Sequence, residues 1–537
     1  MKVKLAGKNR GGQALLRHRA TDGQAALEML IALGVLVFVT SAAITVTFGS
    51  QSTSVDTETN SEGLLIAQKT LEDVRAVSKQ DFNLVNPTLS SQVNGPLTYT
   101  ISLGVEQIDP FTKVVTSTVT WPVGGRTQNV QLTTLFTNPS ALGGGDTCGS
   151  VLSGDWTHPQ KIEYEFGAQI LNDTSSGFPV TSIQTFNKKM YVTVNNDNGN
   201  NDDTFFILDI QDPTIMPPVL GQLDNSPAPN DISEGLNAVA VDGGDYAYVA
   251  NAYDSSPESC LEDDNCAQLQ VIDINDSANP FIAKNFKIQS VTTGNKLASG
   301  QSIFYKDGIV YLGLAKAGNG NDEFFVIDVG GGPGGGSPTN PVILDSEKID
   351  NGVNSVFVRG NYAYVASPND EELKIFKISG SGSITQVGGF DAPGGGGNNG
   401  NGKSLYLVGT KLYFGRTLLN GDELYVLNNT DPETADLPIF GSKNIQDGDD
   451  GQPPAPDNTT VNGVIVRDYL GFLITNGEFQ IWKVDDPVNI ARYATPLILP
   501  PGSGNLQGTA TDCEGNYIYV GSMGSNDKGY ISVITGQ

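Results

Sequence analysis

Histidine is the side chain most often used for proton transfer near neutral pH, and it occurs only twice in this chain of 537 residues, at His18 and His158. Two histidines leave almost no residues from which a Ser-His-Asp triad or a histidine-based zinc site could be built. Acidic residues are plentiful, with 59 Asp and Glu, but their spacing singles out no acid and base pair. The glycine tract Gly394–Gly397 lacks the Gly-Lys-Ser/Thr of a phosphate-binding loop. We predict no catalytic residues and expect that the protein is not an enzyme.

Loops rich in Asp, Asn and Gly are the other groups with possible chemistry, because hard oxygen ligands suit Ca²⁺. These loops, with the acids that could bind calcium, are Asn195–Asp203 with Asp197 and Asp202, Asp447–Gly451 with Asp447 and Asp449, and Gly318–Glu323. None has the 12-residue pattern of an EF-hand. Solvated turns of an acidic protein are the simpler interpretation, so we expect no cofactor, with calcium as the alternative. The glycine tracts at 330–336 and 394–397 are expected to be flexible loops.

The composition limits both partners and fold class. Lys and Arg number 31 against 59 Asp and Glu, which gives a net charge of −28. Because phosphate binding needs a basic surface, nucleic acid is not expected as a partner. The chain also contains 64 Gly and 28 Pro, so turns must be frequent and most of the fold should be β rather than a helical bundle.

The N-terminus has the layout of a targeting segment. Residues 1–23 carry six Lys and Arg against a single acid, Asp22, and no charged residue occurs from Met29 to Phe48. As a helix, residues 29–48 would span the ~30 Å hydrocarbon core of a membrane. The basic flank should remain in the cytoplasm, which places the C-terminal bulk outside the cell. The alternative is a secretory signal peptide that is removed.

An acid stands at the border of this apolar run, in the sequence Asp22-Gly23-Gln24-Ala25-Ala26-Leu27-Glu28. A carboxylate there is costly unless it is paired, so Glu28 is a functional residue by default. The stretch resembles the prepilin signal of type IV pilins and type II secretion pseudopilins. The resemblance implies that a prepilin peptidase removes residues 1–23 after Gly23. Glu28 would then pair with the new amine of a neighbouring subunit in a filament. The family usually has Phe where this chain has Gln24, which bears on N-methylation more than on cleavage.

The next hundred residues extend this resemblance. Residues 24–80 are expected to form a long helix whose later part has an apolar stripe of Leu64, Ala67, Leu71, Val74 and Val77. Residues 81–137 contain alternating runs that predict a small sheet similar to that of minor pilins, at Leu97–Val105, Val114–Trp121 and Thr127–Phe136. Residues 138–150 are rich in Gly and should be a linker.

Residues 151–537 contain a repeat. Strands centred on an aromatic residue recur seven times, at Tyr191, Tyr248, Tyr311, Tyr364, Tyr413, Phe472 and Tyr519. Each is followed by a second apolar run, such as LQVIDI (269–274) or FFVIDV (324–329). Several short strands in units of 40 to 60 residues are typical of a β-propeller, with seven blades here and six or eight as alternatives. The units resemble LVIVD-repeat propellers.

The ends of this repeat indicate how a ring would close. The last unit lacks an outer strand, and Lys161–Phe166 could supply it and hide the open edge. Cys260 and Cys266 flank a short loop and are expected to pair, so Cys148 and Cys513 would join the first and last units. Four free thiols or a metal site are the alternatives, although the CxxC-like spacing of zinc sites is absent.

Two classes of function remain. We favour a minor pilin-like surface protein, held in the membrane or a type IV filament, that displays an extracellular propeller for binding or adhesion. Its expected partners are the prepilin peptidase, other pilin or pseudopilin subunits, the membrane and an extracellular ligand of unknown identity. The alternatives are a membrane-tethered enzyme with its active site in the propeller channel, and a minor pseudopilin of a type II secretion system.

Overall fold

The structure is a computed structural model. It describes residues 59–75, 77–78, 85–95, 97–109, 112–137, 148, 152–174, 177–195, 203–225, 233–253, 267–288, 292–293, 296–318, 320–368, 371–393, 400–417, 421–445, 459–500, 507–524 and 528–537. These residues form two compact units. The first runs to Glu106 and includes Val114–Phe136, and the second comprises Gln107–Lys113 and the chain from Thr137 to Gln537. Both are built mainly from β-strands, as the composition predicted.

Several predictions concern residues outside the described part of the chain. They are the segment 29–48, the cleavage site at Gly23 and Gln24, the acid Glu28, the pair Cys260 and Cys266, the calcium candidates Asp197, Asp202, Asp447 and Asp449, and the glycine tract 394–397. In the residues that are described, no helix has the length and hydropathy needed to cross a membrane.

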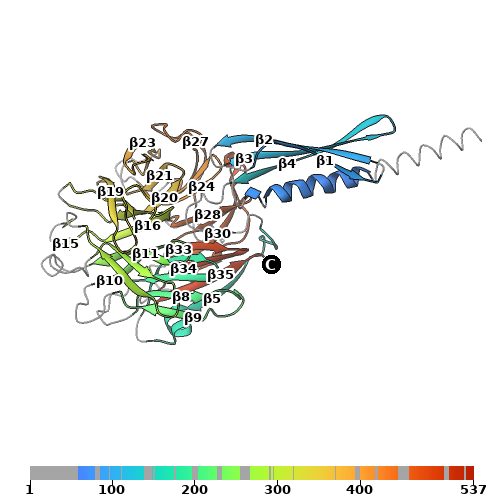
Figure 1. The fold of residues 1–537 in the computed structure, drawn as a ribbon. Helices are drawn as coiled ribbons and strands as arrows, with labels where there is room; N and C mark the ends of the chain where they lie inside the picture. The colour runs from blue at the N-terminus through green and yellow to red at the C-terminus, as the bar shows by residue number, and fades with distance from the viewer. Residues whose placement is uncertain are drawn as a thin grey trace, which may run out of the picture. The chain divides into compact units, whose positions relative to one another are not determined.

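The first unit contains a helix and one four-stranded sheet (Figure 1). The helical residues are 59–75 and 77–78. The strands lie in the order β1 (Thr88–Asn94), β2 (Leu97–Asp109), β3 (Thr112–Val123) and β4 (Arg126–Thr137). The three predicted strands are confirmed within β2, β3 and β4. The sequence missed β1, because all seven of its residues are exposed and no apolar alternation marks it.

The helix packs on the sheet through the middle of the predicted stripe. Ala67 is buried and Leu71 and Val74 pack against a buried cluster of the sheet, whereas Leu64 and Val77, at the ends of the stripe, are 39% and 38% exposed. Near its start the helix meets Trp121, which is buried in the sheet next to Gly63. A Cβ atom at position 63 would lie 2.5 Å from a ring carbon of Trp121. The glycine therefore faces the sheet because only glycine leaves room for the indole.

The second unit contains seven sheets of four or five strands within its described residues, together with a two-stranded sheet of β14 (Thr292–Thr293) and β15 (Lys296–Leu297). In chain order, the first three sheets are β6 (Val180–Phe186), β7 (Lys189–Val194), β8 (Phe205–Asp209) and β9 (Val219–Leu223); β10 (Ser233–Val241), β11 (Tyr246–Tyr253), β12 (Leu269–Asp273) and β13 (Phe281–Phe286); and β16 (Gly300–Lys306), β17 (Ile309–Leu314), β18 (Phe324–Asp328) and β19 (Val342–Glu347). The fourth and fifth sheets are β20 (Ser355–Arg359), β21 (Tyr362–Ala366), β22 (Leu373–Ile378) and β23 (Ile384–Phe390); and β24 (Asn401–Val408), β25 (Lys411–Thr417), β26 (Leu424–Asn428) and β27 (Ile439–Lys443). The sixth sheet has five strands, β28 (Gly463–Arg467), β29 (Leu470–Ile474), β30 (Glu478–Lys483), β31 (Ala491–Arg492) and β32 (Leu497–Ile498), and the seventh is β33 (Gln507–Glu514), β34 (Tyr517–Met523), β35 (Gly529–Thr535) and β5 (Gln160–Glu165). The first three strands of each sheet follow one another in an antiparallel meander.

The pairing of β5 with β35 completes the last sheet with a strand from the start of the unit. The ladder is antiparallel and runs from Tyr530 opposite Glu165 to Thr535 opposite Gln160. Figure 1 shows β5 beside β35, close to the C-terminus. This is the closing strand that the sequence predicted, and it covers an edge that would otherwise be open to pairing with another chain.

The first strands of the seven sheets also follow one another in space. Each contacts the first strand of the next sheet, from β6 to β10 and so on through β28 to β33, and β33 in turn contacts β6. The succession therefore closes on itself. The apolar cores lie between neighbouring sheets: one cluster joins Val192 and Phe206 of the first sheet to Tyr519 and Ile531 of the last.

A buried acid or amide precedes the third strand in several sheets and fixes the end of the fourth strand. The side chains of Gln268, Glu323 and Glu423 accept hydrogen bonds from the backbone N–H of Ile288, Ile349 and Ile445, at 2.8, 2.8 and 2.7 Å. In the loop Gly318–Glu323, one of the calcium candidates, Glu323 is therefore committed to backbone amides.

The glycine tract at 330–336 is ordered around a buried carboxylate, and the expectation of a flexible loop was wrong. Oδ1 of Asp328 accepts hydrogen bonds from Gly330 N and Gly332 N, and Oδ2 accepts from Gly334 N and Gly336 N, at 2.8 to 3.2 Å. A Cβ atom at position 332 would lie 2.7 Å from Cγ of Asp328. Burial favours the neutral acid, but the four N–H groups outweigh it and hold the pKa of Asp328 below its usual value.

We expect Asp328→Ala to lower the free energy of unfolding by about 3–5 kcal/mol, because it leaves several amides without their acceptor. The stabilisation by ionised Asp328 should be lost as pH falls below its ordinary pKa of 3.8, since the folded-state pKa lies lower still. Urea unfolding and amide exchange at 330–336 measure both effects. Asp307→Asn, at a side chain that is 75% exposed, is the control and should cost little. Unchanged amide protection in the Asp328 variant would contradict this account of the loop.

Candidate functional site

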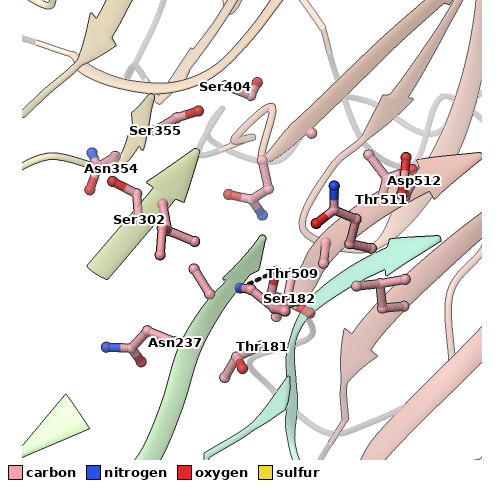
Figure 2. Close-up of a pocket in the computed structure, with 18 of the residues that line it drawn as sticks. Thr181, Ser182, Asn237, Ser302, Asn354, Ser355, Ser404, Thr509, Thr511 and Asp512 are labelled. Carbon is pink, nitrogen blue, oxygen red and sulfur yellow. Dashed lines mark hydrogen bonds between the residues drawn. The ribbon is translucent and has the colours of Figure 1, made fainter. Parts of the chain in front are cut away.

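A cavity of about 1190 Å³ is lined by residues from the first strands of all seven sheets. Figure 2 shows its labelled Ser, Thr and Asn side chains, which come from strands far apart in the sequence and gather around one space. The lining is largely uncharged and mixes polar with apolar side chains. Lys403 and Asp512 are its two charged residues among those described. A concave site where many separate elements converge is the usual place for a ligand.

One polar residue from each sheet projects at an equivalent point of the first strand. In five of the sheets it is the extra residue of a β-bulge against the second strand. In the other two sheets the residue immediately precedes the first strand. Its N–H donates to the carbonyl of a second-strand residue, from Asn354 to Ala366 and from Asn462 to Ile474. Those two acceptors also pair with the first residue of the first strand. We call these residues the bulge ring: Thr181, Asn237, Gln301, Asn354, Lys403, Asn462 and Thr509, all of which line the cavity. Bulges re-aim a side chain, so the ring faces inward because of the strand pairing.

Most of the bulge ring is hydrogen-bonded to the next sheet. Hydroxyl and amide groups donate to backbone carbonyls one sheet further along, and Gln301 donates to the amide oxygen of Asn354. The bonds are Thr181 Oγ1 to Leu236 O (2.5 Å), Asn237 Nδ2 to Gly300 O (2.7 Å), Gln301 Nε2 to Asn354 Oδ1 (3.2 Å), Asn354 Nδ2 to Gly402 O (2.7 Å) and Thr509 Oγ1 to Val180 O (2.5 Å). The bond from Thr509 joins the last sheet to the first. These contacts fix the side chains, use the hydroxyl protons of the two threonines, and use one of the two N–H donors of each amide.

Lys403 is the exception in the bulge ring. Among the described residues it has no hydrogen-bond or ion-pair partner, and it is half-buried. Burial lowers the pKa of its amine. The other charged group, Asp512, accepts hydrogen bonds from Thr185 N (2.5 Å) and Thr185 Oγ1 (3.1 Å), so its carboxylate is already satisfied.

Three aromatic rings form one wall of the cavity. Phe304, Phe357 and Tyr406 lie three residues beyond the bulge ring on consecutive sheets, and all are half-buried. Their neighbouring ring centroids are 5.2 Å and 6.2 Å apart. We call these three residues the aromatic wall. It adds an aromatic surface to a cavity whose lining mixes polar and apolar side chains.

Cys148 and Cys513 form a disulfide, with their Cα atoms 5.0 Å apart. This is the pairing that the sequence predicted. Both cysteines line the cavity, and with Asp512 they make the one group of potential metal ligands among the described residues. Sulfur atoms joined to each other are not thiolates, and thiolates are the form that binds metals. The group is therefore a cross-link rather than a metal centre.

The bulge ring was not predicted, although a signal for it exists. In each unit a polar residue is followed by a small one, in the pairs Thr181-Ser182, Asn237-Ala238, Gln301-Ser302, Asn354-Ser355, Lys403-Ser404, Asn462-Gly463 and Thr509-Ala510. Alignment of the units on their first strands, rather than on their tyrosines, would have revealed it.

No family model and no curated protein matches this chain.

Proposed function

We propose that this protein is a minor pilin-like surface protein that carries a seven-bladed β-propeller outside the cell, with the central cavity as the site for an extracellular ligand. The observation that carries the proposal is the closed succession of seven first strands around a polar cavity, in a chain that begins with a basic leader, Gly23 and Glu28.

The propeller half of the proposal is supported by two features of the closure. The last sheet contacts the first through β33 and β6, with a hydrogen bond from Thr509 to Val180, and β5, from the start of the unit, completes the last sheet by pairing with β35. Radial repetition of four-stranded sheets around a channel, closed by a strand from the other end of the chain, is the propeller architecture.

The pilin half is supported by the sequence signal and by the first unit. A helix that packs on a small meandering sheet follows the apolar segment 29–48, which is the element order of a minor pilin. With a load of nearly 400 residues on each copy, we place the protein at a minor or tip position and not in the filament shaft. Its partners are then the prepilin peptidase, other pilin or pseudopilin subunits and the membrane.

An enzyme with its active site in the cavity is the alternative that a specific residue favours. Lys403 is an amine without a described partner and with a lowered pKa, which is the usual state of a nucleophilic lysine. No histidine is among the described residues that line the cavity, and the acid Asp512 is held by backbone and hydroxyl donors. Binding is therefore the better-supported role.

The proposal is tested by expression in a bacterium that assembles type IV pili, with shearing of the cells to release filaments. We expect the wild-type protein in the sheared fraction and Gly23→Ala unprocessed in the membrane. Glu28→Val should be processed yet depleted at least tenfold from filaments, because it lacks the carboxylate that we expect to pair with the amine of the next subunit and set the register. Glu72→Val, at a helical acid that is 65% exposed, is the matched control. Equal amounts of Glu28→Val and wild type in filaments would contradict the pilin role.

A further inference from the structure

Four hydroxyls of the cavity lining can only accept further hydrogen bonds. Thr181 and Thr509 of the bulge ring donate to backbone carbonyls, and so do Ser302, from Oγ to Val353 O at 3.0 Å, and Ser404, from Oγ to Val461 O at 2.9 Å. A hydroxyl that has committed its proton to a carbonyl retains only lone pairs for a ligand. The amides of Asn237 and Gln301 each use one N–H in the bonds above and keep a second N–H donor. A ligand that satisfies this lining must therefore both donate and accept hydrogen bonds, as hydroxyl groups do.

Lys403 adds one requirement. Its ammonium has no described counter-ion, although the chain as a whole carries a net charge of −28. A half-buried cation is stabilised by an anion that forms a charge-assisted hydrogen bond with it. A metal cation would meet the same acceptors, but Lys403 would repel it. The ligand should therefore carry an acidic group as well as hydroxyls.

The aromatic wall sets a minimum length for the ligand and requires that the ligand have an apolar C–H face. It stands three residues along the strands from the bulge ring, which is about 10 Å at the rise of a β-strand. Aromatic faces pack well on apolar C–H surfaces. A ligand that reaches from Lys403 to Phe357 must therefore be longer than one monosaccharide or one small ion. The cavity of about 1190 Å³ has room for it.

We propose that the cavity binds an acidic oligosaccharide, with its carboxylate on Lys403, its hydroxyls on the acceptors of the bulge ring, and the C–H face of a sugar ring on the aromatic wall. This inference rests on the proposed function and names its ligand class. A peptide C-terminus would also offer a carboxylate, but it brings few hydroxyl groups, which donate to the four committed hydroxyls and accept from the amide N–H groups of the lining. The lining therefore favours the sugar.

The test is calorimetric titration of the full-length protein in detergent with sialyllactose and trigalacturonate, each beside its neutral counterpart, lactose or a neutral galactose trisaccharide. We expect at least one acidic probe to bind at least tenfold more tightly than its neutral partner. Lys403→Met should weaken that binding by about 10- to 100-fold, the value of one charge-assisted hydrogen bond. Lys403→Arg should retain most of it. Lys483→Met, at a side chain that is 52% exposed, changes the net charge equally and should have no effect.

Three outcomes would overturn the proposal: no binding of either acidic probe, equal binding of acidic and neutral probes, or full affinity in Lys403→Met. Binding of a short peptide that depends on its free C-terminus, without binding of the sugars, would assign the cavity to peptides instead. Unfolding temperatures of the variants separate a loss of ligand contact from a loss of fold. If the protein enters filaments but binds neither acidic sugar, the ligand class is wrong and the proposed pilin role is unaffected.

Discussion

A chain that starts at Asn172 should fail to fold as a soluble monomer, whereas one that starts at Asp146 should fold alone. The segment between the two starts supplies β5, without which β35 has an open edge. It also supplies the buried rings of Trp156 and Phe166, which are 3% and 0% exposed. Removal of buried aromatic side chains costs about 3–5 kcal/mol each, comparable with the whole stability of an ordinary domain.

The same segment is held to the C-terminus by direct contacts. Asp155 and Gln537 exchange two backbone hydrogen bonds, at 2.7 and 3.1 Å. The ring centroids of Trp156 and Phe472 are 4.9 Å apart in an edge-to-face arrangement. Size-exclusion chromatography and circular dichroism of the two chains are the measurements. Aggregation of the shorter chain is the expected result. Equal behaviour of the two chains under oxidising conditions would mean that the ring closes elsewhere.

Cys148→Ser in the longer chain is the matched variant, because it removes the cross-link and leaves β5 in place. The disulfide spans 365 residues, for which chain entropy allows about 5 kcal/mol or more as an upper figure. We therefore expect a lower melting temperature with the fold retained. Cys260→Ser, in the pair predicted to close a short loop, should matter less.

Arg416→Met should be the most destabilising single change among the described ion pairs, with a cost of about 3–5 kcal/mol at pH 8. Arg416 and Glu372 belong to neighbouring sheets, and their side chains are 1% and 2% exposed, with Nη2 2.7 Å from Oε1. Burial raises the pKa of Glu372 to about 7, although the Arg416 guanidinium opposes that rise. Without the arginine, a carboxylate would be left in an apolar interior.

The pH dependence of this variant follows from the direction of that shift. Without Arg416 the folded-state pKa of Glu372 should rise further above its ordinary value of 4.5, so the folded state holds a proton that the unfolded state has released. Stability should therefore fall as pH rises from about 5 to 8, and acid should restore part of the loss. Urea unfolding across this range is the measurement.

Two further variants make the result specific. Glu372→Leu added to Arg416→Met should recover most of the loss, because well-packed apolar side chains replace a buried ion pair at little or no cost. Lys377→Met breaks an exposed pair with Glu433, whose side chains are 51% and 42% exposed, and should cost at most ~1 kcal/mol. Similar costs for Arg416→Met and Lys377→Met would refute the account.

The repeat was predictable because its second and third strands keep one pattern, an aromatic residue in the second and a run of aliphatic residues in the third. Strands β6 and β33 were missed, since VTSIQTF and QGTATDCE interleave polar residues with few apolar ones. Their apolar partners come from the adjacent sheets, which a local pattern does not show. The helix face was predicted except at the ends of the stripe, where Leu64 and Val77 are exposed. The close approach of Gly63 to the indole of Trp121 was missed because Trp121 is distant in the sequence.

The candidate site could not be predicted from local sequence. A bulge directs each ring residue into the cavity, and it depends on register against a neighbouring strand rather than on the residue itself. The seven ring residues also come from seven units, so only the closed arrangement brings them together. The disulfide was predictable because it followed from the closure of the repeat. Glu372 and Arg416 were not predictable, because nothing in the local sequence separates a buried acid from the many exposed ones.

The intact mass of the protein from cells that contain a prepilin peptidase tests the central claim most directly. Cleavage after Gly23 would give a chain whose first residue is Gln24, and Gly23→Ala should abolish that cleavage. The account predicts this mature chain, with or without one methyl group on its N-terminal amine. A chain that retains residues 1–23, or one cleaved near Ser41–Ala43 as a secretory signal peptide would be, would contradict it.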